Sequence, residues 1–269
     1  MLSSKTIESG WTASERRELM CHLKNGSIEV IDRSQMPRNR KPVRFTWVYK
    51  WKRDGTQKSR LCVQGCSQVP GVDYDQTFCA TMRPTSLRVM AALSARLGLS
   101  MRRWDFVTAY LQGDLEEGEI TYCHMPAGYG MLGADGQPRV CRVLKPIYGM
   151  SQAGRRWQRF LFPWIEGWRK GTLARSHADG CVFHCTKTVQ TPTGPRVENL
   201  IIGCYVDDLL ITYSHDDKHS LYAAFTRDLA ARWDVDDEGD VTDLLGIDIS
   251  IEENCVCVPQ TNKLCEETR

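Results

Sequence analysis

The sequence lacks any long uncharged hydrophobic run. A membrane-spanning helix needs about 18 or more consecutive apolar residues, and no stretch of the 269-residue chain approaches that length. The opening Met1-Leu2-Ser3-Ser4-Lys5 also lacks the apolar core of a signal peptide. We therefore expect an intracellular protein, cytoplasmic or nuclear and not secreted, that makes no contact with a membrane.

Low-complexity tracts and internal repeats are also missing, which excludes collagen, coiled coils and disordered linkers. The chain is 42% apolar and 25% charged, the composition of an ordinary globular protein that can bury a sizeable core. Its length suits one large domain or two subdomains that share a core.

The chain has almost no overall excess of charge of one sign, since its net charge is only +2. This balance hides an asymmetry. Residues 1–104 contain 19 Lys and Arg against 8 Asp and Glu, whereas residues 105–269 contain the remaining 16 against 25. A basic half joined to an acidic half suggests one surface for a polyanion and another that concentrates carboxylates. An uneven but fully solvated surface is the alternative.

Cysteine, by contrast, is abundant, with 12 residues. A disulfide framework is typical of small secreted domains, which this chain does not resemble. The pairs Cys62/Cys66 and Cys181/Cys185 lie too far apart in the sequence for a typical structural zinc site. Residues 181–185 alternate like a strand, which would place both cysteines on one face. We expect reduced, mostly buried thiols, with a zinc site as the weaker alternative.

A hairpin is predicted over residues 45–63. Aromatic residues alternate with Lys50 and Lys52, Asp54-Gly55 supplies a turn, and the alternation then returns through Lys58 and Arg60. The outer face of this hairpin should be cationic, although lysines on an exposed strand also serve merely to discourage aggregation.

A helix is expected after Pro84. Thr85 or Ser86 would be its N-cap, apolar residues recur at helical spacing, and Gly98 would end it. This apolar stripe indicates a core-facing helix.

Two more helices are expected further along the chain. One begins near Gln152, and Pro163 within its apolar pattern should kink it or end it. The other spans about residues 220–233, where large apolar residues recur every fourth position.

An acidic pair, Asp207-Asp208, interrupts two apolar strand-like runs in residues 199–213. Because Asp is tolerated in tight turns, we expect a hairpin with both carboxylates at its tip. Adjacent carboxylates repel each other unless a cation is present. Asp105 provides a third carboxylate in a similar setting. Three carboxylates are typical of metal-assisted phosphoryl transfer with two Mg²⁺ ions, which prefer hard oxygen ligands.

The segment Tyr205-Val206-Asp207-Asp208 resembles the catalytic turn of reverse transcriptases. Its surroundings resemble the copia-type branch of LTR retrotransposons, over about residues 11 to 262. Further motifs follow in the order of that family: residues 47–50, 58–61, 71–78, 105–113, 148–157 and 245–249. Several motifs in order are far more specific than the acidic pair alone.

The resemblance implies an α+β right-hand polymerase fold. It would have a palm with an antiparallel sheet backed by helices, fingers built largely from the basic N-terminal half, and a thumb that is largely missing. The implied organisation is a polar N-terminal segment over residues 1–24, a reverse transcriptase domain over residues 25–262 and a tail over residues 263–269. Because residues 1–27 are polar, we expect them to be loosely attached. Residues 245–247 would belong to a hairpin that grips the primer.

The resemblance also implies RNA-directed DNA polymerase activity, in which two-metal nucleotidyl transfer extends a primer 3′-hydroxyl. Asp105, Asp207 and Asp208 would be the catalytic residues and would hold two Mg²⁺ ions, with Mn²⁺ as the alternative metal. The partners would be an RNA or DNA template-primer and deoxynucleoside triphosphates (dNTPs).

Four further residues would bind the incoming dNTP by the family pattern. Tyr110 would be a steric gate against a 2′-hydroxyl, Gln152 would contact the nucleotide from the fingers, and Lys58 and Arg60 would reach its triphosphate. Each has a plain alternative: Tyr110 as a core aromatic, Lys58 and Arg60 as solvated strand charges, and Gln152 as a neighbour of a helix N-cap.

The sequence departs from the family pattern at a few positions. Ser151 and Gly154 stand where members usually have Lys and Pro, and Asp236 stands where a Lys is common. A catalytically inactive nucleic-acid-binding relic is therefore the alternative to an active polymerase. A metal-dependent phosphohydrolase built on the same aspartates is less favoured, because it needs neither a sugar gate nor a long cationic track.

Overall fold

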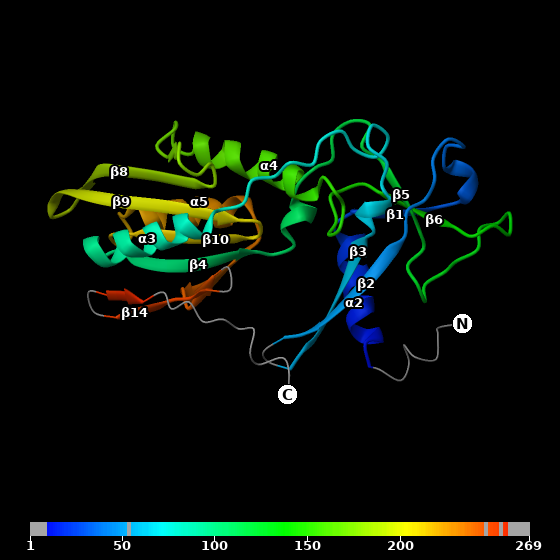
Figure 1. Cartoon of the computed structure of the whole chain (residues 1–269), viewed down its shortest axis with the longest axis horizontal. Coiled ribbons are helices and arrows are strands. Elements are labelled where there is room, and N and C mark those ends of the chain that lie inside the picture. The colour runs from blue at the N-terminus through cyan, green and yellow to red at the C-terminus, as the bar shows by residue number, and fades with distance from the viewer. Residues whose placement is uncertain (1–9, 53–54, 245–246, 253–254, 258–269) are drawn as a thin grey trace. The chain divides into compact units, whose positions relative to one another are not determined.

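The structure, a computed structural model, describes residues 10–52, 55–244, 247–252 and 255–257 (Figure 1). The chain divides into two compact units, one formed by residues 1–79 and 108–160 and the other by residues 80–107 and 161–269. The helices are α2 (Thr12–Lys24), α3 (Pro84–Leu97), α4 (Ala153–Gly167) and α5 (Leu221–Arg232). Helices combined with antiparallel sheets agree with the predicted α+β class.

The first unit contains two small antiparallel sheets. Its strands are β1 (Ile28–Ile31), β2 (Phe45–Trp51), β3 (Gln57–Val63), β5 (Thr121–His124) and β6 (Val140–Val143). β1, β6 and β5 form one sheet, and β2 and β3 form the other. Single-turn 3₁₀ helices cover Arg33–Gln35, Gly65–Ser67 and Ala109–Gln112. Leu61 and Val63 of β3 share a buried core with Cys123 and Val143, so the hairpin and the three-stranded sheet pack together.

The predicted hairpin over residues 45–63 is confirmed, since β2 pairs with β3 from Phe45 opposite Val63 to Trp51 opposite Gln57. In an antiparallel pair, opposed residues share a face. Lys50 and Lys58 therefore lie on the same face of the hairpin.

The expectation that residues 1–27 are loosely attached is wrong for the helix α2. Ser14 Oγ accepts a hydrogen bond from the backbone N–H of Ser59 at 2.7 Å, and Glu18 Oε1 accepts one from Leu61 N–H at 3.1 Å. Side chains of α2 thus satisfy backbone donors on the open edge of β3. A polar helix can be firmly attached because its polar groups bond to a strand edge.

The second unit is built around a six-stranded antiparallel sheet with the order β11-β4-β10-β9-β8-β7 (Figure 1). The strands are β4 (Ser100–Phe106), β7 (Ala174–Arg175), β8 (Val182–Thr191), β9 (Gly194–Tyr205), β10 (Asp208–Tyr213) and β11 (Val235–Asp240). Two short pairs follow: β12 (Asp243–Leu244) with β13 (Ile247–Asp248), and β14 (Ser250–Glu252) with β15 (Cys255–Cys257).

The helix after Pro84 is confirmed as α3, and it ends at Gly98 in the left-handed conformation, with φ of 62°. The predicted N-cap is wrong, because the N-cap is Arg83 and Pro84 occupies the first turn. Proline suits the first helical position, where its missing N–H is not needed and its φ is already helical. Glycine at position 203 of β9 lets α3 and the residues before it approach the sheet: a Cβ there would lie 3.1 Å from the sulfur of Met90 on α3 and 2.5 Å from that of Met82.

The other two helices follow the sequence with one difference. α5 begins after Ser220, whose Oγ accepts from Ala223 N–H at 3.0 Å, as a capping residue should. α4 does not end at Pro163 but continues to Gly167, so of the two effects expected of this proline only a kink stays a prediction. Beyond the proline, the Trp164 ring lies 4.6 Å from that of Trp233, and this aromatic packing helps to hold the last turn of the helix.

The alternation predicted over residues 181–185 is also confirmed. Cys181 and Cys185 are buried with Phe183 between them, while His184 is exposed. In the ranges that the structure describes, no cluster of His, Cys, Asp or Glu has the arrangement of a metal site. No helix there is long and apolar enough to cross a bilayer. Leu245 and Gly246 of the predicted primer-gripping hairpin lie outside the described residues, as does the tail over 263–269.

Candidate active site

The acidic pair lies at the tip of the β9–β10 hairpin, as predicted. Tyr205, the last residue of β9, pairs with Asp208, the first residue of β10, so Val206 and Asp207 form a two-residue turn. Val206 adopts a left-handed conformation with φ of 53°. A β-branched residue is strained there, so the flanking strands must enforce the turn.

The structure places Asp105 beside this turn. Asp208 is the register partner of Asp105 on β4, and the backbone N–H of Phe106 donates to the carbonyl oxygen of Asp207 at 3.0 Å. Directly opposed residues on antiparallel strands have Cα atoms about 4.5–5.5 Å apart. Three aspartates from two distant segments therefore meet at one end of the sheet.

A fourth carboxylate extends this row through a strand pairing that the sequence did not predict. Asp236 of β11 is the register partner of Asp105 on the side away from β10. Asp236, Asp105 and Asp208 therefore occupy one face of three adjacent strands. The sequence singled out Asp236 only as a departure from the family pattern, and this does not reveal the pairing of β11 with β4.

Burial and mutual repulsion raise the carboxylate pKa values. The pKa of Asp105 rises to about 6, because burial and the charges of Asp208, Glu238 and Asp207 all disfavour its ionised form. Burial also raises the pKa of Asp208, although the guanidinium of Arg103 opposes this shift. The group therefore carries more negative charge than its protein surroundings neutralise, which is typical of a site for a cation.

Arg103 is the counter-charge within the protein. Its Nη2 lies 2.9 Å from Asp208 Oδ1, its Nε lies 3.0 Å from Glu238 Oε2, and Asp243 lies further away at 3.9 Å. The neighbouring Arg102 instead pairs with Asp237, at 3.3 Å. Adjacent strand residues point to opposite faces, so Arg103 alone serves the face that carries Asp208.

The donor set suits a hard divalent cation such as Mg²⁺ or Mn²⁺, because Asp105, Asp207 and Asp208 offer carboxylate oxygens. In the described part of the chain, however, no three such side chains are arranged as a metal site. One reason is that Asp208 Oδ1 accepts from both Nε and Nη2 of Arg103, at 3.0 and 2.9 Å. The residue types fit the metal, and a cation bound by Asp208 must compete with Arg103.

Three of the four predicted nucleotide-binding residues form a second group, within the first unit. The guanidinium of Arg60 lies over the ring of Tyr148 at 4.8 Å, and the Tyr148 ring lies 4.7 Å from that of Tyr110. Lys58 is two residues from Arg60 on β3 and so shares its face. The structure therefore links a cationic strand face to the predicted sugar gate through one aromatic ring.

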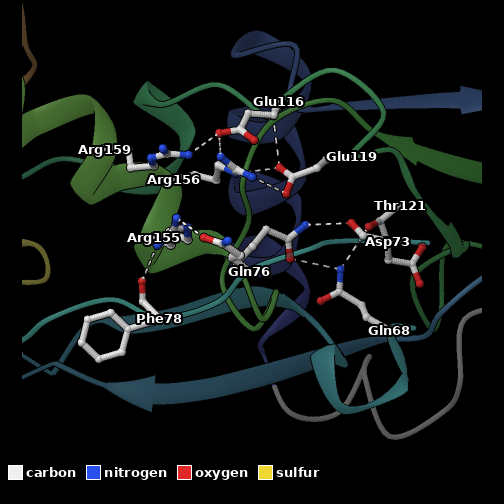
Figure 2. A network of polar contacts seen from close by, with 11 residues as sticks. Gln68, Asp73, Gln76, Phe78, Glu116, Glu119, Thr121, Arg155, Arg156 and Arg159 are labelled. Atoms are coloured by element: carbon white, nitrogen blue, oxygen red, sulfur yellow. Dashed lines mark hydrogen bonds and ion pairs between the residues drawn. The ribbon is translucent and has the colours of Figure 1, made fainter. Parts of the chain in front are cut away.

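Gln152 is placed differently from the other three. Its side chain is fully buried; Oε1 accepts from Gln68 Nε2 at 3.3 Å and Nε2 donates to the carbonyl oxygen of Asp73 at 3.2 Å. Gln68 also donates to Thr121 Oγ1 at 3.1 Å (Figure 2). The amide of Gln152 thus ties the start of α4 to the loop around Asp73, and its contact with a nucleotide stays a prediction.

Three arginines of α4 extend this polar network (Figure 2). Arg156, only 5% exposed, donates to both carboxylate oxygens of Glu119, at 2.6 and 2.5 Å, and also pairs with Glu116. Arg159 reaches Glu116 at 2.8 Å, and Arg155 bonds to the carbonyl oxygen of Phe78 at 3.3 Å. The buried Arg156–Glu119 pair holds a loop against α4, a structural role that the family motif alone did not reveal.

Comparison with known proteins agrees with this geometry. The profile of the family described as reverse transcriptase (RNA-dependent DNA polymerase) matches residues 28–266. The chain is 33% identical, over 87% of its length, to the retrovirus-related Pol polyprotein from transposon TNT 1-94 of Nicotiana tabacum. It is 31% identical, over 75% of its length, to the corresponding polyprotein from transposon RE2 of Arabidopsis thaliana.

A more distant relative is the transposon Ty1-LR2 Gag-Pol polyprotein of Saccharomyces cerevisiae, 28% identical over 68% of the chain. The chain spans 16%, 13% and 9% of the lengths of these three polyproteins. The match therefore concerns one part of each. With the family profile covering nearly the whole chain, the protein belongs to the reverse transcriptase family of copia-type Pol polyproteins.

Proposed function

We propose that this chain is an RNA-directed DNA polymerase that extends a primer by two-metal nucleotidyl transfer. The observation that carries the proposal is the register of the Asp207-Asp208 turn against Asp105. That register brings three carboxylates from residues 105 and 207–208 to one end of a sheet, where repulsion raises the pKa of Asp105 to about 6. A protein gains nothing in stability from such a cluster without a cation, so function is the better explanation.

Asp105, Asp207 and Asp208 would hold the metal. When bound, two Mg²⁺ ions activate the primer 3′-hydroxyl and stabilise the leaving pyrophosphate. The role of the protein is to keep the three carboxylates in register and ionised. Because the pKa of Asp105 is about 6, this group is already mostly ionised at neutral pH.

The second unit, with its six-stranded sheet, would be the palm, and the first unit would be the fingers. On the first unit, Lys58 and Arg60 would bind the triphosphate and Tyr110 would exclude a 2′-hydroxyl. The ring of Tyr148 between Arg60 and Tyr110 supports their joint action. Gln152 would contact the nucleotide only after its amide leaves Gln68, so we assign it the weakest role of the four.

Primer extension on an RNA template with Mg²⁺ tests the proposal. Asp207→Asn should reduce single-nucleotide incorporation about a thousandfold or more, because metal-ion stabilisation of the reaction is worth several kcal/mol. Its fold should stay intact, since the substitution removes repulsion. Asp237→Asn is the matched control, because Asp237 is a neighbouring carboxylate on β11 that pairs with Arg102 instead.

Full incorporation by Asp207→Asn would contradict the assignment of the metal site. If the unchanged chain binds template-primer but never extends it, the inactive relic is correct instead.

A further inference from the structure

Helix α4 has no side chain at the position that lies beside the predicted sugar gate. Gly154 is the second residue of α4, and a Cβ atom there would lie 3.3 Å from the sulfur of Cys79 and 4.0 Å from the Tyr110 hydroxyl oxygen. The distance to the sulfur is shorter than an ordinary van der Waals contact, so Cys79 would have to yield by a few tenths of an ångström. Gly154 and Cys79, here called the gate wall, therefore border the same small space as the Tyr110 hydroxyl.

Glycine is an unfavourable residue at this point of the chain. Gly154 is helical, and glycine in a helix is less stable than alanine. Gly167, at the other end of α4, differs from it, because no other group of the described chain lies within 4 Å of a Cβ there. A proline, usual at residue 154 in the family, would place its ring in the space next to Cys79. Close approach of the thiol therefore accounts for glycine at residue 154 and not at residue 167.

Polar contacts hold both parts of the gate wall in place. The buried amide of Gln152 anchors the start of α4. The segment that leads to Cys79 is held by Arg155 of the same helix, which donates to the carbonyl oxygen of Phe78 at 3.3 Å and to the side chain of Gln76 (Figure 2). The helix and this segment are thus tied to each other on either side of the thiol. An added methyl group would have to be accommodated within the wall itself.

The other sides of Tyr110 are also packed. Tyr110 lies in the 3₁₀ helix Ala109–Gln112, whose residues Ala109 and Leu111 are buried. Its ring lies 4.7 Å from that of Tyr148. The half-buried Tyr110 side chain therefore has Tyr148 on one side and the gate wall beside its hydroxyl.

We propose that Gly154 and Cys79 are positioning residues that fix the Tyr110 hydroxyl and so determine how strictly deoxyribose is selected over ribose. A steric gate discriminates only if its ring cannot retreat when a 2′-hydroxyl presses on it. The sulfur of Cys79 blocks this retreat, and the missing side chain at residue 154 gives the sulfur its room. Burial raises the pKa of the Cys79 thiol, so the wall is uncharged at neutral pH. This inference rests on the proposed function, because it concerns the selectivity of the same nucleotide site.

The test is the ratio of kcat/KM for a ribonucleotide and the matching dNTP, measured by single incorporation with the full chain and Mg²⁺. Cys79→Ala should raise relative ribonucleotide use at least about threefold, because the ring can move into the space that the sulfur leaves. Gly154→Ala should raise it by a similar factor, since the added methyl displaces the sulfur and the hydroxyl. Both effects should be smaller than that of Tyr110→Val, which removes the gate itself.

The decisive variant combines the two substitutions. In Gly154→Ala with Cys79→Ala, the new methyl group occupies the space of the missing sulfur. The ratio should therefore return to within about twofold of that of the unchanged chain, as expected for residues in direct contact. Two independent losses of about threefold would instead multiply to about ninefold.

Gly167→Ala is the matched control on the same helix. A methyl group there meets no other group of the described chain, so the ratio should not change. Thermal unfolding of each variant shows that it is folded before its ratio is compared.

Unchanged ratios in both single variants would overturn the proposal, as would a double variant whose effect is the product of the two. If Tyr110→Val changes the ratio while the gate-wall variants do not, only the positioning role fails and the proposed gate stands. An unchanged ratio for Tyr110→Val would show instead that the gate itself is wrong. A chain that incorporates neither sugar would overturn the proposed function and this inference together.

Discussion

The two hairpins that carry the candidate functional residues differ in how they are supported. The β2–β3 hairpin is a separate two-stranded sheet whose predicted ligand side chains, Lys58 and Arg60, lie on an open face. The β9–β10 hairpin lies within a six-stranded sheet, with β8 and β4 on its two sides. Its aspartates, Asp207 and Asp208, are half-buried at the tip.

The difference follows from the charges that each hairpin holds. Lysine and arginine are long, stay charged in solvent and reach a ligand from a mobile side chain. Aspartate is short, and several carboxylates held together repel one another, so only a rigid sheet keeps them in register. We therefore expect substitutions in β2–β3 to change ligand binding with little effect on stability, and substitutions around β9–β10 to change both.

Among the tests of this comparison, the largest expected effect concerns the β2–β3 hairpin. Arg60→Gln should raise the KM for dNTPs about 10- to 100-fold, because a hydrogen bond to a charged group is worth about 1.5–3 kcal/mol. The Tm should not change measurably. Steady-state incorporation and thermal unfolding test both parts, with Arg44→Gln as the control, since Arg44 is exposed just before the same hairpin. A fall in Tm without a change in KM would show that Arg60 stabilises the fold through its contact with the Tyr148 ring and does not bind the nucleotide.

The sugar gate should give the next largest effect. Tyr110→Val should increase ribonucleotide use relative to deoxyribonucleotide use at least about tenfold, because removal of steric exclusion in a tight site changes discrimination by about 1–3 kcal/mol. The measurement is the ratio of kcat/KM for the two sugars. An unchanged ratio would show that Tyr110 is a core aromatic that packs on Tyr148.

The β9–β10 hairpin is tested by replacing Arg103, the cation that pairs with Asp208. Without Mg²⁺, Arg103→Gln should lower the free energy of unfolding by about 1–2 kcal/mol, since it leaves Asp208 and Glu238 without their cation. Arg102→Gln, on the other face of the same strand, should cost less. Denaturant unfolding compares the two variants. Addition of Mg²⁺ should reduce the deficit of Arg103→Gln only, and equal deficits with and without the ion would show that Arg103 and the metal do not share Asp208.

The last expected effect is a pH dependence of stability. The pKa of Asp105 is raised to about 6 in the folded chain, so folding favours its protonated form. That stabilisation is present below the unfolded pKa and is lost as the pH rises through about 6. Without metal, Asp105→Asn should therefore match the unchanged chain near pH 4 and exceed its stability above pH 7. Parallel unfolding curves measured across this range are the test, and a constant difference at every pH would contradict the pKa shift.

Local sequence signals were sufficient for the elements that depend on neighbouring residues. Alternation predicted the β2–β3 hairpin, and apolar runs around an acidic turn predicted the β9–β10 hairpin. Apolar spacing placed the last helix at about residues 220–233, and Gly98 was predicted as a helix end. These features depend on backbone conformation within a few residues, which side-chain type controls directly. The family motifs singled out Asp105, Asp207 and Asp208, and the sheet register now shows them together.

Only the tertiary structure decided which distant residues meet. Asp236 lies opposite Asp105 because β11 pairs with β4, and Gln152 is buried because Gln68 and Asp73 surround its amide. The polar helix α2 is attached because a strand edge offers it backbone donors. The physical reason is that periodicity and turn chemistry are local properties of the chain. Register, burial and ion pairing depend instead on contacts between residues far apart in sequence, which form only when the sheets assemble.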